Sequence, residues 1–289
     1  MSGCSATQFA GVPYVGALFD SSNGQPTTHF ATAFVVAGKY GNMLMSAAHI
    51  LNGRSASSII FAPGYADGQA PHNLWHVHKA YTDSAWQANQ GIDDDFCFLK
   101  VGADVQGRVG SLDLLTGVHP QTCNVIGYPD GLTSPVQATV QAVWYSPEHQ
   151  LKFTCDGYPN GTSGSPWIIN GNSAYGLLGG YQQGGDTPSV SYSPYFGANV
   201  RNLYDSANGA FLLCSAPGQD KARLSKPAAD RAKAPHRVIR WKHPLAADRA
   251  SHQVACAAAS RPVGADAVRR SRAPCEVRCR TPFPRRRSR

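Results

Sequence analysis

The stretch that decides the fold of this chain reads Gly161-Thr162-Ser163-Gly164-Ser165-Pro166-Trp167. Glycines on both sides of Ser163 free its backbone for a tight turn, which lets the N–H groups of Gly161 and Ser163 point into one small space. Two such donors form an oxyanion hole, a site that stabilises a developing negative oxygen. The alternative is an ordinary turn rich in Gly and Ser, and residues elsewhere in the chain decide between the two.

The residues after this turn predict a β-hairpin. The apolar runs Trp167–Ile169 and Ala174–Leu178 flank Asn170-Gly171, the strongest short hairpin signal. We therefore expect Ser163 on a loop that leads into a hairpin. This context argues against an α/β-hydrolase or a subtilisin-type serine, because both of those precede a helix.

A serine hydroxyl becomes a good nucleophile only beside a base, so a histidine held rigidly by the fold is needed. Of the ten histidines, His49 has the most suitable context. Apolar runs at 34–36 and 43–45 predict a second hairpin around Gly38–Asn42, and the second run leads directly into Ser46-Ala47-Ala48-His49. The small residues before His49 allow close packing there.

The base in turn needs a carboxylate to orient it. The acidic run Asp93-Asp94-Asp95 leads into an apolar strand over Phe96–Val101. A carboxylate at the entry of a strand can be buried against a histidine, whereas three solvated loop acids are the alternative.

These motifs resemble those of the trypsin/chymotrypsin-like serine proteases, specifically the bacterial, actinobacterial-type members. Ser46–His49 is similar to the T-A-A-H of the family, Asp95–Leu99 to its D-[IF]-A-x-L, and Gly161–Pro166 to its G-D-S-G-G-P. The order His, Asp, Ser is that of the chymotrypsin template and differs from that of subtilisin. The resemblance extends over about residues 11–205.

The resemblance implies a serine endopeptidase that hydrolyses polypeptides through an acyl-enzyme intermediate and needs neither a cofactor nor a metal. His49 would be the general base, Asp95 its orienting carboxylate and Ser163 the nucleophile. An extended segment, Gly179-Gly180-Tyr181, would pair with the substrate backbone. The alternative is a catalytically silent, protease-like binding protein; such relatives usually lose the His or the Ser, and both are present here.

The resemblance leaves the substrate preference open. In this family a residue about six positions before the nucleophile often sets the primary specificity, and that position is Gly157, with Asp156 beside it. An inward Asp156 would favour Arg or Lys, and an outward one an apolar or small residue. Leu178 stands where relatives selective for glutamate tend to have a His, which argues against an acidic preference.

Two departures from the family pattern leave the triad untouched. Thr162 replaces the aspartate that receives a newly cleaved N-terminus in animal relatives, so that activation switch should be absent. Ile50 stands where many relatives have a disulfide cysteine. A subtilisin order of Asp20, His49 and Ser163 fits the spacing, but His49 lacks the flanking glycines and helix pattern which that family needs.

Composition and turn signals predict an all-β fold. The chain has 289 residues with 29 Gly and 20 Pro, and short apolar runs lie between its turns. The resemblance implies two antiparallel six-stranded β-barrels, chymotrypsin-like, with the active site in the cleft between them. We expect one barrel in 1–110, carrying His49 and Asp95, and one in 111–214, carrying Ser163. The predicted strands lie near 31–36, 43–47, 58–61, 75–80 and 95–101, then 123–127, 136–145, 151–154 and 195–200, followed by a short helix from about 202.

Charge divides the chain at about residue 214. Residues 1–214 contain 7 Lys and Arg against 13 Asp and Glu, whereas residues 215–289 contain 19 against 5. The acidic body argues against nucleic-acid binding by the folded part. We expect the basic tail, 215–289, rich in Arg, Ala and Pro, to be disordered. An anion-binding arm and a frame-shifted translation of a GC-rich gene are the alternatives.

The remaining features concern location and cysteines. No apolar run reaches 18 residues, so we expect no membrane span. We also expect the protein to be a monomer. No signal peptide is recognisable, although a protease of this type is expected to be secreted. Cys155 is the best disulfide candidate, with Cys123 as a suggested partner, and Cys97 is expected to pack as a small apolar residue. His72, His76 and His78 lack the further ligands of a metal site, and a polar strand face is the favoured interpretation.

Overall fold

The structure is a computed structural model that describes residues 3–209. The first half contains a closed six-stranded barrel with the strand order β2-β3-β4-β7-β6-β5. Its strands are β2 (Val15–Ser22), β3 (Gln25–Val35), β4 (Met43–Ser46), β5 (Ile59–Pro63), β6 (Trp75–Thr82) and β7 (Cys97–Val101). β5 and β7 are buried along their whole length, and most of β2 and β3 is as well, because their Val, Ile, Leu and Phe side chains fill the barrel and its outer contacts.

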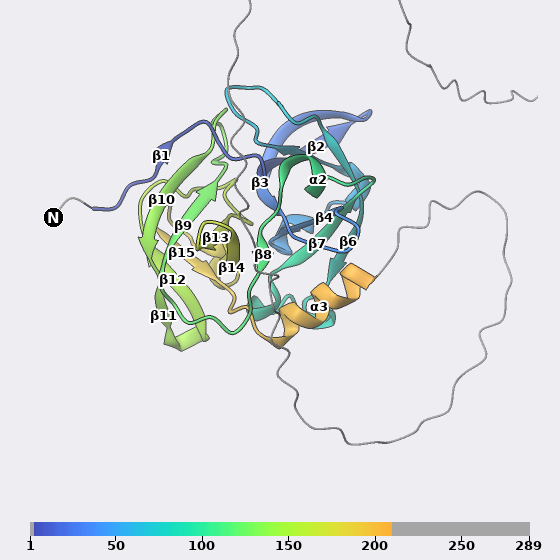
Figure 1. Ribbon diagram of the computed structural model, residues 1–289. Helices are drawn as coiled ribbons and strands as arrows, with labels where there is room; N and C mark the ends of the chain where they lie inside the picture. The colour runs from blue at the N-terminus through green and yellow to red at the C-terminus, as the bar shows by residue number, and fades with distance from the viewer. Residues whose placement is uncertain (1–2, 210–289) are drawn as a thin grey trace, which may run out of the picture. The chain divides into compact units, whose positions relative to one another are not determined.

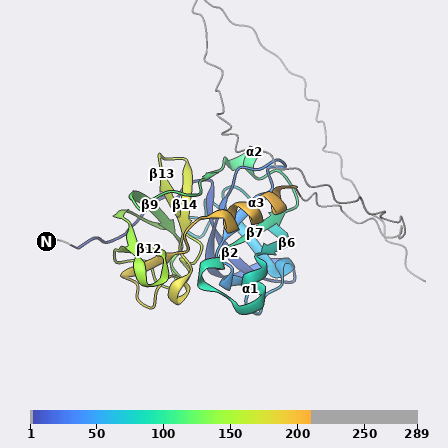
Figure 2. The same cartoon turned by 90° about the horizontal axis from the view of Figure 1, so that it is seen from below.

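The second half contains a six-stranded sheet, in the order β1-β10-β9-β13-β14-β8, and a three-stranded sheet, β11-β12-β15. The six strands of the larger sheet are β1 (Thr7–Gln8), β8 (Asp113–Leu114), β9 (Thr122–Gly127), β10 (Val136–Gln141), β13 (Pro166–Ile169) and β14 (Ser173–Leu177). The smaller sheet consists of β11 (Val143–Tyr145), β12 (Gln150–Thr154) and β15 (Val190–Ser193). A core that includes Trp167, Phe153 and Tyr175 lies between them. The expected all-β, chymotrypsin-like architecture is confirmed, and Figures 1 and 2 show the two halves side by side.

Helical segments are short. The α-helices are α1 (Ser84–Asn89), α2 (Gln106–Val109) and α3 (Ala198–Gly209), and the 3-10 turns are His49–Leu51, Ala56–Ser58, Ile92–Asp94, Ser146–Glu148 and Tyr181–Gly184. No helix within residues 3–209 has the length and apolar character to cross a membrane.

Both predicted hairpins form where local sequence signals are strong. β3 and β4 pair with Phe34 opposite Met45. β13 and β14 meet at Asn170-Gly171, where both residues have a left-handed backbone, with φ of 54° and 75°. Asn and Gly are the residues that accept this conformation most readily, and the turn therefore closes without strain.

Two expected elements are wrong. The strand near 195–200 does not form: β15 ends at Ser193, and Ala198 already begins α3. The strand near 136–145 is interrupted at the buried Ala142, so that β10 and β11 belong to different sheets. An alternating run of apolar and polar residues does not reveal where a strand leaves one sheet for the next, because the alternation continues through both pieces.

The segments at the two ends of the described chain each pack on the half that is distant in sequence. β1 pairs with β10 of the second half, and Cys4 forms a disulfide with Cys155. The suggested Cys123–Cys155 bond is thus corrected, because Cys123 is a buried free thiol. At the other end α3 packs on the first barrel, where the Tyr204 hydroxyl donates to the carbonyl of Ala37 at 2.8 Å (Figure 1). The domain limits 1–110 and 111–214 stay a prediction, and the tail 215–289 lies outside the described residues.

Candidate active site

His49 and Asp95 meet because the strands beside them are paired. β4 and β7 are antiparallel neighbours, with Ser46 opposite Cys97, so the end of β4 lies against the start of β7. The His49 N–H donates to Oδ1 of Asp95 at 2.8 Å, and Nδ1 of His49 lies 2.7 Å from Oδ2. Asp95 is only 1% exposed, so the imidazole is held by a carboxylate that water barely reaches.

Ser163 approaches the histidine from the other half of the molecule. Its Oγ lies 2.8 Å from Nε2 of His49, which completes a continuous chain from serine through histidine to aspartate. The flanking glycines are required: Gly161 and Gly164 have φ of 91° and 87°. A Cβ on Gly164 would also collide with the Ser46 side chain and the Thr32 carbonyl of the first barrel.

Two peptide groups of this loop are held so that their N–H groups face outward. The carbonyl of Asn160 accepts the Asp130 N–H at 2.7 Å, and the carbonyl of Thr162 accepts the N–H and hydroxyl of Ser165 at 3.0 and 2.6 Å. In a trans peptide the N–H points away from the carbonyl of the same group. The N–H groups of Gly161 and Ser163 are thereby turned away from these partners, and they donate to no described residue.

Thr32 of β3 ties the same loop to the first barrel, a role that the sequence did not suggest. Its N–H donates to the carbonyl of Ser163 at 2.9 Å, and its buried hydroxyl donates to the carbonyl of Gly161 at 3.0 Å. That hydroxyl also accepts the N–H of Tyr128 at 2.9 Å. A threonine inside an alternating strand looks like any other strand residue, so only the fold reveals this contact.

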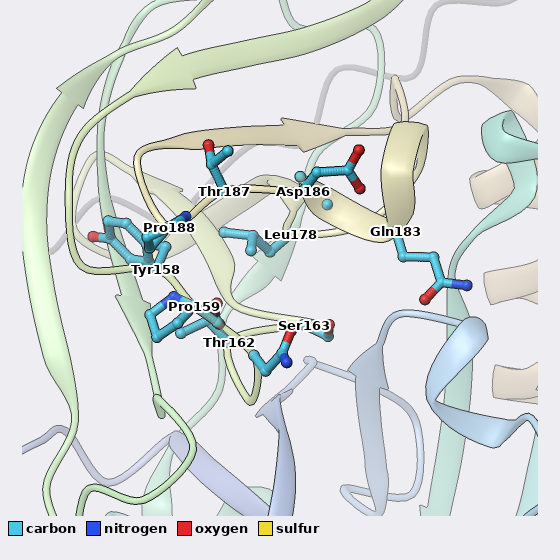
Figure 3. A pocket seen from close by; sticks show the side chains of 12 residues that line it. Tyr158, Pro159, Thr162, Ser163, Leu178, Gln183, Asp186, Thr187 and Pro188 are labelled. Carbon is cyan, nitrogen blue, oxygen red and sulfur yellow. Dashed lines mark hydrogen bonds between the residues drawn. The ribbon is translucent and has the colours of Figure 1, made fainter.

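A cavity of about 220 Å³ opens beside Ser163 (Figure 3). Leu178 and the ring of Tyr158 form part of its lining, together with Thr187 and Pro188. The Tyr158 hydroxyl donates to the carbonyl of Val125 at 2.9 Å, and burial raises the pKa of this phenol, so it stays neutral. The one charged side chain in the lining is Asp186, which is exposed.

The predicted specificity residues lie elsewhere. Asp156 is exposed and does not line this cavity; its N–H donates to the carbonyl of Cys4 at 3.0 Å. Gly157 lies against Ala6, so that a Cβ there would approach the Ala6 Cβ to 2.9 Å. Both residues contact the N-terminal segment, and Tyr158 and Asn160 are the neighbours that line the cavity. A role of Asp156 and Gly157 in specificity stays a prediction.

The segment expected to be extended is instead bent. Gly180 has a φ of 80°, and Tyr181 begins a 3-10 turn. The N–H groups of Gly179, Gly180 and Tyr181 donate to the Tyr192 carbonyl at 3.1 Å, to Oδ2 of Asp95 at 2.7 Å and to Oε1 of Gln150 at 2.8 Å. Their role in substrate pairing therefore stays a prediction that rests on their carbonyl groups.

A second cavity, of about 380 Å³, lies on the His49 side of Ser163. Phe30 and Arg54 contribute to its lining. The guanidinium of Arg54 stacks 3.9 Å from the centre of the Phe30 ring and forms an ion pair with Asp20 at 2.7 Å. Asp20 therefore neutralises a surface cation, whereas the carboxylate bound to His49 is that of Asp95, so the subtilisin order does not apply.

Cys97 is fully buried beside the site, as expected for a small apolar residue. Burial raises the pKa of its thiol, and the negative charge of Asp95 raises it further, so the group stays protonated. Its Sγ donates to the carbonyl of Ala47 at 3.3 Å. Within residues 3–209 the structure contains no cluster of three or more His, Cys, Asp or Glu that could hold a metal ion.

Comparisons with known proteins agree with this geometry. The family model described as trypsin-like peptidase domain matches residues 31–177, just over half of the chain. No curated protein sequence matches.

Solved structures share the fold at low sequence identity. Protease Anisep from Arthrobacter nicotinovorans is 21% identical over 71% of this chain and all of its own, with a TM-score of 0.60. The thermostable serine protease AL20 from an extremophilic microorganism is 22% identical over 68% of this chain and 97% of its own, with a TM-score of 0.58. A Glu endopeptidase is 17% identical over 73% and 99%, with a TM-score of 0.58.

Proposed function

The chain belongs to the family of trypsin-like peptidases and is a serine endopeptidase, and from this membership we propose that it cleaves polypeptides through an acyl-enzyme formed on Ser163. The observation that carries the proposal is the hydrogen-bonded chain from Ser163 through His49 to Asp95, with separations of 2.8 and 2.7 Å. In this proposal His49 is the general base and Asp95 orients it.

In the first step Oγ of Ser163 attacks the carbonyl carbon of the scissile peptide. The Ser163 proton moves to Nε2 of His49, the Oγ–C bond forms, and the electron pair of the C=O bond moves onto oxygen. The N–H groups of Gly161 and Ser163, which donate to no other described residue, would receive that negative oxygen. Asp95 stabilises the imidazolium and keeps the proton of the neutral ring on Nδ1.

The intermediate then collapses in two stages. The C–N bond breaks, and the leaving amine takes the proton from Nε2 of His49, which leaves an ester on Ser163. A water molecule next attacks the ester carbon while His49 accepts one of its protons. Return of that proton to Oγ releases the acid and regenerates the serine.

We propose that the residue whose carbonyl is attacked, P1, is uncharged. The cavity beside Ser163 is walled by Leu178 and the neutral Tyr158, and an outward Asp156 matches the apolar or small alternative that the sequence left open. A buried carboxylate would lose its hydration there without a cation to pair with. An ion pair between a basic side chain and the exposed Asp186 would add little binding energy, because water screens such pairs.

The disulfide supports a site of action outside the cytosol. Cys4 and Cys155 are bonded, and such bonds persist in oxidising compartments, whereas thiols stay reduced in the cytosol. We therefore propose an extracellular protease that acts on polypeptides. The catalytically silent alternative is disfavoured because His49 and Ser163 are both present and in hydrogen-bond contact.

The proposal is tested with a fluorophosphonate probe. We expect labelling of Ser163 alone, because a serine beside a base and an oxyanion hole reacts where ordinary hydroxyls do not. Ser163→Ala should abolish both labelling and peptide hydrolysis. Ser173→Ala, a buried serine on the neighbouring hairpin, is the matched control. Labelling that survives Ser163→Ala would refute the assignment.

A further inference from the structure

Gln150 is a buried polar residue that links the two halves next to the site. It lies on β12 and is fully buried. Its Oε1 accepts the N–H of Tyr181 at 2.8 Å, and its Nε2 donates to Oδ1 of Asp93 at 3.1 Å. Burial of a carboxamide is costly unless its groups are hydrogen-bonded, so both bonds fix its position.

The backbone segment that Gln150 binds also donates a hydrogen bond to the catalytic carboxylate, Asp95. Tyr181 follows Gly180, whose N–H donates at 2.7 Å to Oδ2 of Asp95. The same oxygen lies 2.7 Å from Nδ1 of His49. Among the described residues, this is the one hydrogen bond that the Asp95 side chain receives from the second half.

Gly180 cannot hold this arrangement by its own conformational preference. Glycine adopts positive and negative φ almost equally well, and here φ is 80°. Its Cα packs directly on Gln150, since a Cβ at this position would collide with the carboxamide. The neighbouring Gly179 has no side chain that could reach Asp95. The orientation of the Gly180 N–H therefore depends on the groups around it, and Gln150 contacts it directly.

We propose that Gln150 is a positioning residue for the triad, which rests on the proposed function above. By holding the Gly180–Tyr181 backbone, it supplies Asp95 with a third hydrogen bond beyond the two from His49. A carboxylate with three donors is fixed in rotation and its charge is well compensated. Without the third, Asp95 would orient His49 less well, and the effect would fall on the chemical step because Gln150 lines neither cavity beside Ser163.

The test compares Gln150→Met with Gln141→Met. Gln141 also uses both ends of its carboxamide, accepting from Thr122 at 2.6 Å and donating to the Ala142 carbonyl at 2.9 Å, but it lies on β10 and lines neither cavity. We expect Gln150→Met to lower kcat by about tenfold, the worth of one hydrogen bond to a charged group, with KM unchanged within about twofold. Gln141→Met should leave both constants near the wild-type values.

A charge-conserving exchange supplies the rescue. In Gln150→Glu/Asp93→Asn the carboxylate and the amide trade places, so the Tyr181 N–H keeps its acceptor and the bridge between positions 150 and 93 keeps a donor and an acceptor. We expect kcat to return to within about threefold of the wild type.

Wild-type kcat in folded Gln150→Met, or a change confined to KM, would overturn the positioning role. If Gln150→Met does not fold, Gln150→Asn applies the same test, since it keeps a buried carboxamide but withdraws it by one methylene. An inactive wild type that the phosphonate probe does not label would instead refute the proposed function, so the two failures are distinguishable.

Discussion

At the scale of single residues, the site depends on side chains that fix peptide groups rather than on the triad alone. The oxyanion donors are backbone groups, and their direction is set by what binds the carbonyl on the other side of each peptide. The fully buried Ser165 donates two hydrogen bonds to the Thr162 carbonyl, one from its N–H and one from its hydroxyl. Preorganised donors are effective because they need no rearrangement during the reaction.

Replacing Ser165 by Ala tests this idea. The variant loses the 2.6 Å bond from the hydroxyl to Thr162 while its N–H still binds the same carbonyl. We expect kcat to fall by about fivefold with KM little changed, because one hydrogen bond of about 1 kcal/mol no longer fixes the peptide that presents the Ser163 N–H. Steady-state kinetics of Ser165→Ala and Ser173→Ala measure it, and equal kcat values would contradict it.

At the scale of elements, three loops combine to shape the pocket that receives P1. Residues 158–160 precede the nucleophile, Leu178 follows β14, and residues 183–188 connect the Tyr181–Gly184 turn to β15. Figure 3 shows Leu178 and Tyr158 among the side chains that line the pocket. Gln183 lines both this pocket and the second cavity on the His49 side of Ser163. The pocket chemistry is thus set by segments that are distant in sequence.

Peptide p-nitroanilides that differ only at P1 measure the resulting preference. We expect kcat/KM to be highest for Leu, Met or Phe, lower for Lys and Arg, and lowest, by about a hundredfold, for Asp and Glu, because the wall offers an anion no cation. Asp186→Asn should leave the values for uncharged P1 residues unchanged and reduce only those for Lys and Arg. A maximum at Glu or at Arg would contradict this interpretation of the pocket.

The sequence predicts well those features that are determined by residues close together in the chain. The hairpin at Asn170-Gly171 and the motif around Ser163 depend on turn chemistry that neighbouring residues contain in full. The bond between Cys4 and Cys155, 151 residues apart, has no local signal. Gln150 and Thr32 also escape prediction, because a polar residue in a strand reads as solvent-facing until the fold shows what covers it. The bend at Gly180 is decided by Gln150 and Asp95, which no spacing rule connects to it.

At the scale of the whole molecule, the ends of the described chain join the halves. The segment Cys4–Gln8 is bonded to the second half, and α3 returns to the first barrel, where Tyr204 packs edge-on against Phe98 at 5.8 Å. Figure 2 shows α3 running along the barrel. Because the triad draws His49 and Asp95 from one half and Ser163 from the other, loosening of either end should lower the temperature at which the site comes apart.

Removal of the disulfide measures the contribution of the N-terminal end. We expect Cys4→Ser/Cys155→Ser to lose about 3 kcal/mol of unfolding free energy, which corresponds to a Tm lower by about 6–12 °C, because the cross-link restricts the unfolded chain. Activity at 25 °C should be retained, since neither cysteine lines a cavity beside Ser163. Calorimetry and kinetics on the double variant, with reduced and oxidised wild type for comparison, provide the measurement. An unchanged Tm would show that β1 pairing alone holds this segment.

Thr162 bears on when activity appears during the life of the protein. It is fully buried, and its hydroxyl donates to the Pro159 carbonyl at 2.6 Å, so the loop around Ser163 is closed by a bond between neighbours. No newly exposed ammonium group is needed to order that loop. The order of the loop around Ser163 is therefore reached by folding, through a bond between neighbouring residues, and position 162 carries no charge that a later cleavage could pair.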